Sequence, residues 1–370
     1  RTQLRANYIN HRLGNYGATL EREHPSRQCE GNDRELEALQ QELRGGHVGA
    51  LFLYGVNPVF ELPGGEEFAR ALKRIPLVVS FSERLDETSS HAHFVCPEPH
   101  FLESWGDAEA VPGIVSLCQP VMNPLGETRP LVESLAAWMG EPKTAYEIIR
   151  THWESKIFPR QSRERSFQEF WDHAVERGFA EVASGRIALK PFRLDAVQPP
   201  PSSHQAEKEA LSLVLYPKVS MRDGRHAHNA WLQELPDPIS KVAWDNYANL
   251  SPATARRLGV LQGDVVRLEL AEGSRSIELP AYVQPGQHDG VVAVALGYGR
   301  AGTARFAKAG PQWLFGRSGV GENGLVGVNA APLRGLTNGA LSYSGRAVRS
   351  TKAGRQQPLA CTALHRSRPA

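Results

Sequence analysis

A group of polar residues follows the first apolar run of the chain, where a parallel sheet would present a ligand-binding edge. Residues 48–54 (VGALFLY) have the length and apolar character of a buried strand, and Gly55, Asn57 and Pro58 come directly after it. Ligands of open parallel sheets bind beyond the carboxyl ends of the strands. Glycine lets a backbone approach a phosphate, and an asparagine amide both donates and accepts hydrogen bonds. The segment therefore suits a ligand-binding loop, although the same residue types also build ordinary turns.

A second polar group, Asp86-Glu87-Thr88, follows the next predicted strand at residues 77–81. We expect Glu87 and Thr88 at the same ligand edge, because parallel strands end on one side of their sheet. A carboxylate there can accept hydrogen bonds from a ribose or a guanine. Capping of a helix is the alternative role of this group.

The loop at residues 216–231 (YPKVSMRDGRHAHNAW) combines several groups that bind ligands. Guanidinium groups bind phosphates, and aromatic rings stack on flat ligands, so the mixture suits an anionic, aromatic ligand. An exposed polar loop is the alternative. The candidate residues are Tyr216, Arg225, His226, Asn229 and Trp231.

The cysteines and histidines form no recognisable metal site. The chain has four cysteines without a C-x-x-C pair, whereas iron–sulfur clusters and structural zinc need several thiolates at short spacing. Five further potential ligands lie close together in the sequence: His91, His93, Glu98, His100 and Glu103. Their spacing matches no standard zinc site, and His226-Ala227-His228 is an equally weak signal. We therefore predict no metal site, and spacing alone supports no catalytic residue.

Charge and hydropathy argue against two kinds of direct partner. The formal net charge is +2 with Lys and Arg scattered, whereas nucleic-acid-binding proteins usually show a clustered basic footprint. The chain has no apolar run of about 18 residues, so we predict no membrane-spanning helix. It begins without Met, inside a helix-like pattern that ends at Gly14, and we expect a piece of a longer protein.

The first part of the chain alternates helix and strand signals. Asn32 and Glu35 are spaced as a helix-capping pair, and residues 66–73 and 131–139 show helical periodicity. Strand–helix–strand order favours parallel strands with crossover helices. Residues 141–196 are more helical, with Ser166 and Glu169 as a second capping pair.

The apolar period changes to two after the Pro-rich segment at 197–203, which we predict to be a domain boundary. Residues 265–270 and 277–283 alternate, and residues 291–296 form a buried run, a pattern typical of a small barrel or sandwich. Between the strands, a helix is expected from Ser251-Pro252 to Gly259. The predicted organisation is an α/β domain (1–140), a helical extension with linker (141–203), a β-barrel domain (204–345) and an irregular basic tail (346–370).

In order, these segments resemble the C-terminal domains of molybdopterin oxidoreductases. Residues 48–105 resemble the family's third domain, in which a strand leads into G-x-N-P and a later E-T pair. SPATARRLGVLQGD (251–264) resembles a segment of its dinucleotide-binding double-psi β-barrel. The matching positions are Gly55, Asn57, Pro58, Glu87, Thr88, Asp264 and, for a late G-V-N element, Gly327-Val328-Asn329. The resemblance implies a fold of the α/β class, in which a Rossmann-like parallel-sheet domain precedes the double-psi barrel.

A narrower resemblance concerns the molybdopterin-like subunit of bacterial alternative complex III. LESWGDAE (102–109), SLCQP (116–120), ETRP (127–130) and ACTALH (360–365) resemble that subunit. It implies a membrane-associated, quinol-oxidising respiratory complex, in which the chain is attached through its partners at the periplasmic face of a bacterial membrane. The implied partners are iron–sulfur and haem c proteins and a quinone-binding membrane subunit, with any iron–sulfur clusters in those partners or in segments outside this chain.

Three substitutions depart from the enzyme pattern: Ser82, His93 and Thr254 stand where the family usually has acids. They favour a scaffold that binds no cofactor, although the resemblance leaves an alternative. In that alternative the chain is the C-terminal half of an active molybdenum enzyme and contacts a bis-pterin guanine dinucleotide. The contacts would come from the candidate residues above together with Asn329, and no catalytic residue would lie in this chain.

Overall fold

The computed structural model describes residues 2–22, 24–28, 30–185, 193, 210–273, 275–308, 324–336 and 340–362. The chain divides into two compact units. The helical unit comprises Arg1–Gly31 and Cys96–His204, and the barrel unit comprises Asn32–Val95 and Gln205–Ala370. This division differs from the predicted domains, because residues 32–95 pack with the barrel rather than with residues 96–140. The predicted boundary at 197–203 lies outside the described residues.

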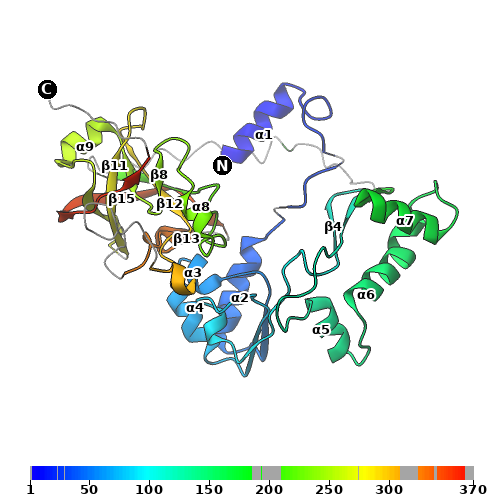
Figure 1. The fold of residues 1–370 in the computed structure, drawn as a ribbon. Helices are drawn as coiled ribbons and strands as arrows, with labels where there is room; N and C mark the ends of the chain where they lie inside the picture. Colours follow the sequence, from blue (N-terminus) through cyan, green and yellow to red (C-terminus); the bar gives the residue numbers. More distant parts are fainter. Residues whose placement is uncertain are drawn as a thin grey trace. The chain divides into compact units, whose positions relative to one another are not determined.

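The barrel unit starts with a parallel sheet covered by helices (Figure 1). Its elements are α2 (Asp33–Gly45), β1 (Ala50–Leu53), α3 (Pro58–Glu61), α4 (Gly65–Leu72), β2 (Leu77–Ser80), η1 (Ser89–His91) and β3 (Phe94–Val95). Helices α2 and α4 bury Leu43, Phe68 and Leu72 against the sheet. The side chain of Asn32 caps α2 by accepting from Arg34 N at 3.1 Å. The expected strand–helix–strand order is present, and the Rossmann-like character of this sheet stays a prediction.

Six of the described strands close into a barrel in the order β10-β11-β9-β12-β7-β15. They are β7 (Leu211–Pro217), β9 (Ala248–Leu250), β10 (Asp264–Leu270), β11 (Ser276–Val283), β12 (Val291–Leu296) and β15 (Ser344–Gln356). Two strand pairs are parallel (β7 with β12, β9 with β11) and the other four are antiparallel, an arrangement that fits the expected double-psi barrel. The interior is filled by Leu, Val and Ala side chains, including Leu213, Leu268 and Val294. The barrel predicted from the two-residue period is therefore confirmed.

Shorter elements lie around the barrel strands. They are α8 (Ala230–Glu234), β8 (Val242–Ala243), α9 (Pro252–Leu258), η5 (Ala304–Phe306), η6 (Ala331–Leu333), β13 (Gly335–Leu336), β14 (Leu341–Ser342) and β16 (Ala360–Cys361). The predicted helix α9 is confirmed: Ser251 caps it through its side chain, and Gly259 ends it with a left-handed φ of 65°. Ser251 and Pro252 thus set the start of this helix by local chemistry.

The prediction of an irregular tail at 346–370 is wrong for the described part of that segment. Strand β15 pairs with β7 on one side and β10 on the other, and so closes the barrel. The basic residues that suggested a solvated terminus are paired: Lys352 lies 2.7 Å from Asp264, and Arg355 lies 3.0 Å from Glu278. The sequence of β15 shows no clear alternation of apolar and polar residues, because few of its inward-facing residues are apolar and many of its outward-facing residues are charged.

The helical unit is built around aromatic side chains. Its elements are α1 (Thr2–Arg12), β4 (Gly106–Val111), β5 (Ile114–Cys118), α5 (Leu131–Trp138), α6 (Ala145–His152), η2 (Trp153–Ile157), η3 (Phe158–Arg160), α7 (Phe167–Arg177) and β6 (Phe179–Glu181). Trp153, Phe170 and Trp171 pack together in its core. The expected helices and the Ser166 cap are confirmed. The antiparallel sheet β4-β5-β6 was not predicted, because the sequence of β4 (GDAEAV) lacks apolar alternation.

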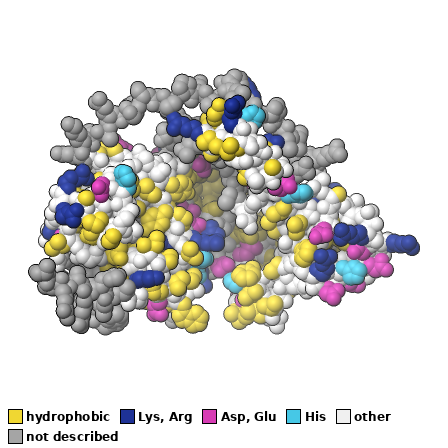
Figure 2. All heavy atoms as spheres, turned by 90° about the horizontal axis from the view of Figure 1, so that it is seen from above, with side chains coloured by type: hydrophobic (Ala, Val, Ile, Leu, Met, Phe, Trp, Pro, Cys, Tyr) yellow, Lys and Arg dark blue, Asp and Glu magenta, His cyan; other side chains and the backbone are white. Residues whose placement is uncertain are grey.

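Among the described residues, no helix has both the length and the apolar character needed to cross a bilayer. On the face shown in Figure 2, Lys and Arg side chains are interspersed with acidic and hydrophobic ones. This distribution agrees with the scattered basic residues of the sequence.

Candidate functional site

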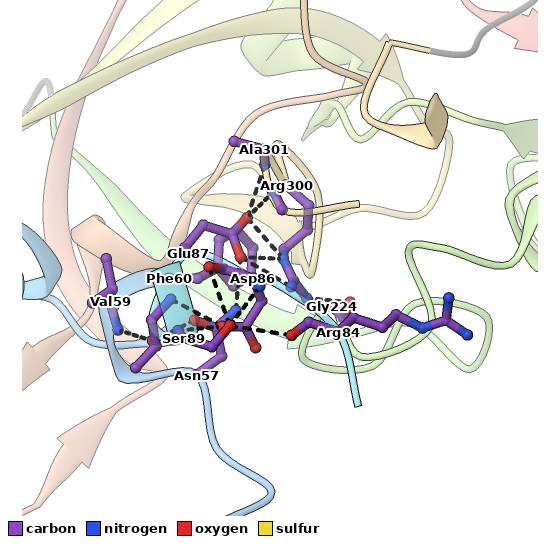
Figure 3. A network of polar contacts seen from close by, with 12 residues as sticks. Asn57, Val59, Phe60, Arg84, Asp86, Glu87, Ser89, Gly224, Arg300 and Ala301 are labelled. Carbon is purple, nitrogen blue, oxygen red and sulfur yellow. Dashed lines mark hydrogen bonds and ion pairs between the residues drawn. The ribbon is translucent and has the colours of Figure 1, made fainter. Parts of the chain in front are cut away.

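Asn57 and Glu87 meet at the carboxyl edge of the parallel sheet, as expected (Figure 3), and Thr88 bonds to Asn57 there. Asn57 precedes α3, but its side chain does not cap that helix. Its amide nitrogen donates to the Glu87 carboxylate at 2.8 Å, and its amide oxygen accepts from the Thr88 hydroxyl at 2.6 Å. Thr88 in turn accepts from Val59 N at 3.0 Å. Asn57 and Thr88 are buried, so their hydrogen bonds are made to protein groups rather than to solvent.

Arg300, from the loop that follows β12, completes this polar network. Its Nε lies 3.0 Å from both carboxylate oxygens of Glu87, and its Nη1 donates to Gly224 O at 2.6 Å. The two side chains are only 10% and 14% exposed. Burial alone would raise the pKa of Glu87, but the hydrogen bonds and charge of Arg300 outweigh it and hold that pKa below its usual range. We call Asn57, Glu87, Thr88 and Arg300 the polar network.

Sequence reasoning missed Arg300. A usable signal existed, because Gly297-Tyr298-Gly299-Arg300 directly follows the buried run at 291–296. The rule that selected Asn57, a polar group after a strand, also selects Arg300. The pairing itself could not be read from the sequence, since Glu87 and Arg300 are 213 positions apart.

Close backbone packing joins the sheet to the loop that carries Arg300. A Cβ on Gly302 would lie 2.6 Å from the Cα of Asp86, and a Cβ on Gly299 would lie 2.3 Å from the backbone nitrogen of Asn329. Side chains cannot occupy such positions without a backbone shift. Ala301 N and Gly302 N also donate to Glu87 at 2.8 and 2.9 Å. The 297–302 loop therefore lies directly on the edge where a ligand was expected.

Asn329, another candidate, joins the barrel to α3. Its amide nitrogen donates to Phe60 O at 3.0 Å, and its oxygen accepts from Ala331 N at 2.9 Å. The segment that carries Asn329 is positioned by Asn246, which is fully buried. The side chain of Asn246 hydrogen bonds to Val328 N and Val328 O, both at 2.9 Å. Asn246 was not predicted, because nothing in its sequence context marks it as buried.

The other candidates do not join the polar network. Gly55 has a left-handed φ of 62°, which supports the turn alternative, and Pro58 is the first residue of α3. Asp86 accepts from Thr88 N and Ser89 N at the turn that leads into η1. Ser82 hydrogen bonds to Arg84 O at 2.7 Å.

In the loop at 216–231, three of the candidate side chains make hydrogen bonds to other residues of the same loop or of the helix that follows it. Arg225 makes a bidentate ion pair with Asp223, His226 lies 3.1 Å from Ser220 O, and the side chain of Asn229 caps α8. Tyr216 lies on β7, where burial and the charge of Asp237 raise its pKa to about 12. Trp231 is 84% exposed. Met221 and Ala227 of the same segment are buried, so the loop is partly packed into the barrel unit, and a ligand-binding role for its side chains stays a prediction.

The histidines and acids that the sequence placed close together make structural contacts. His93 Nδ1 accepts from Val78 N at 2.9 Å, Glu103 accepts from His100 N, and Glu98 accepts from Leu131 N. In the part of the chain that the structure describes, no three His, Cys, Asp or Glu side chains are arranged to hold a metal ion.

Asp245 is a buried acid beside the same barrel loop. It is fully buried and accepts from Gly327 N at 3.1 Å. Burial raises its pKa to about 7, against the opposing effect of that hydrogen bond. Lys218 carries a nearby charge, with Nζ 3.6 Å from Asp237 and 4.5 Å from the ring centre of Tyr247. Burial lowers the pKa of Lys218.

We expect Asp245→Asn to remove a pH-dependent part of the stability. Because the folded-state pKa lies above the usual value of 3.8, the folded chain holds a proton that the unfolded chain releases. This contribution is complete below about pH 4 and is lost as the pH rises through about 7. The stability advantage of the wild type over Asp245→Asn should therefore fall between about pH 4 and pH 7, by up to about 1.4 kcal/mol per pH unit, and stay level above that range. Urea denaturation at each pH measures it, and a constant difference would contradict the burial of this acid.

At the edge of the sheet, the polar groups that the resemblance assigns to a pterin dinucleotide are bonded to protein groups. Each polar group there has a protein partner, and the 297–302 loop covers it. The cavity bordered by Tyr298, Arg300 and Phe306 measures about 10 Å³. Such a volume holds about one water molecule.

The sequence was compared with known families and proteins, and no family model matches it. It is 28% identical over 295 residues to the "menaquinone reductase, molybdopterin-binding-like subunit" of Nitratidesulfovibrio vulgaris, covering 78% of this chain and 40% of that protein. It is 23% identical over 323 residues to the thiosulfate reductase molybdopterin-containing subunit of Salmonella typhimurium, covering 75% and 41%. The chain thus spans about 40% of the length of the curated relatives it matches.

Among solved structures, acetylene hydratase from Pelobacter acetylenicus shares the fold. The TM-score is 0.61 at 18% identity, over 85% of this chain and 46% of that one. The expected resemblance is confirmed by these matches. The chain is similar in sequence to molybdopterin-binding subunits of oxidoreductases and shares its fold with acetylene hydratase.

Proposed function

We propose that this chain is the C-terminal part of a molybdopterin-oxidoreductase-like subunit that acts as a cofactor-free scaffold. The complex is a membrane-associated, quinol-oxidising electron-transfer assembly of the alternative complex III type. The observation that carries the proposal is the polar network: Asn57, Glu87 and Thr88 bond to one another and to Arg300. Residues expected to contact a dinucleotide thus hold the protein together instead.

The partners follow from the proposed complex. Electrons pass through iron–sulfur and haem c subunits, and a membrane subunit binds the quinone and anchors the assembly at the periplasmic face. Support for a quinone-linked, multi-subunit complex comes from the relative in Nitratidesulfovibrio vulgaris, which is named as a subunit of a menaquinone reductase. In this arrangement the chain supplies shape and docking surfaces, and redox chemistry occurs on the partners.

Metal and pterin analysis of the full-length subunit, purified with its partners from native membranes, tests the proposal. We expect molybdenum and tungsten far below one atom per subunit, and no pterin fluorescence after acid oxidation. A molybdopterin-containing enzyme from the same cells is the control for cofactor supply. Stoichiometric molybdenum with pterin would overturn the scaffold and support the active-enzyme alternative.

A further inference from the structure

The guanidinium group of Arg300 is enclosed by three separate segments of the barrel unit (Figure 3). Nε and Nη2 lie 3.0 and 2.9 Å from the Glu87 carboxylate, and Nη1 donates to Gly224 O at 2.6 Å. The ring centre of Phe60 lies 4.8 Å from the central carbon. Each nitrogen has an acceptor, and an aromatic ring lies against the cation.

The acceptor is held in place without help from Arg300. Asn57 donates to Glu87 at 2.8 Å, and the Thr88 hydroxyl fixes Asn57 at 2.6 Å. All three residues belong to the parallel-sheet segment. The barrel loop adds Ala301 N and Gly302 N as donors to Glu87, and these backbone groups remain when the Arg300 side chain is removed. A carboxylate held in this way is preorganised for a planar, forked donor.

We propose that Glu87, Gly224 O and Phe60 form a guanidinium-binding site whose resident occupant is Arg300. The occupant joins the sheet to the barrel from within the chain, where an external ligand was expected. The inference goes beyond the scaffold role, because it concerns what the site recognises and not whether molybdenum is present.

The chemistry of the site is selective. Its acceptors are a carboxylate and a carbonyl, which attract cations and repel phosphate groups. A guanidinium satisfies both through a fixed fork, whereas an ammonium is a compact and strongly hydrated point charge without that planar set of donors. A small guanidinium should therefore refill the site when the Arg300 side chain is removed.

Chemical rescue of the Arg300→Ala variant of the 370-residue chain tests the proposal. The variant leaves Glu87 buried without its partner, and we expect Tm to fall by roughly 10 °C. Methylguanidinium at about 10 mM, some tenfold above a millimolar dissociation constant, should restore a few degrees. Methylammonium chloride at the same concentration should not, and neither ion should stabilise the wild type.

The control is the double variant Glu87→Gln/Arg300→Ala, which lacks the carboxylate and should show no rescue. An unchanged Tm in Arg300→Ala would overturn the proposal, as would equal rescue by methylammonium or of the double variant. If Arg300→Ala is isolated unfolded, the refolding yield replaces Tm. A yield raised by methylguanidinium only when Glu87 is present supports the site, and equal yields with both ions refute it.

Discussion

Replacing Val348 with aspartate is expected to unfold the barrel, whereas replacing Thr351 with aspartate on the same strand should leave it folded. Val348 is fully buried and pairs with Leu270 on β10 and with Leu211 on β7. A carboxylate there has no partner within a core of aliphatic side chains, and the loss should exceed about 4 kcal/mol. Thr351 is exposed opposite Arg267, so its replacement should change stability by about 0.5 kcal/mol or less.

Circular dichroism and urea denaturation of both variants measure this difference. The comparison bears on the segment that looked like an irregular tail, because such a tail would tolerate both substitutions equally. If Val348→Asp folds as well as Thr351→Asp, the placement of β15 in the barrel is contradicted.

The second large effect is expected for Gly299→Ala. Gly299 has a φ of 74°, and a Cβ there would lie 2.3 Å from Asn329 N and 2.8 Å from the carbonyl carbon of Val328. Both contacts are with backbone, so the barrel must shift to admit a single methyl group. We expect a loss of about 4 kcal/mol or more, measured by urea denaturation.

Gly259→Ala is the matched control in the same unit. Gly259 has a similar φ of 65° at the end of α9, but a Cβ there meets nothing within 4 Å. Its cost should be about 1 kcal/mol, the usual penalty for a side chain in the left-handed region. The difference between the two variants isolates the close packing of the 297–302 loop. Equal losses would show that backbone strain alone explains the effect of Gly299→Ala.

Elements with local signals were predictable. Helices α2 and α9 start at side chains that satisfy their first backbone N–H groups, and α9 ends at a glycine with positive φ. Strands β10, β11 and β12 carry apolar residues that a barrel interior selects. Strand β15 was not predicted, because its inward-facing positions hold few apolar residues and charged residues lie between them.

The sequence by itself determined that Asn57, Glu87 and Thr88 would lie on one edge of a parallel sheet, because strand order and strand ends are local features. It left open whether those groups face a ligand or the protein. Only the tertiary structure decided this, by bringing Arg300 from a loop 213 positions away onto Glu87. The physical reason is that a buried carboxylate needs a partner, and many distant residues could supply one. The choice of Arg300 depends on how the barrel packs on the sheet, which no local pattern encodes.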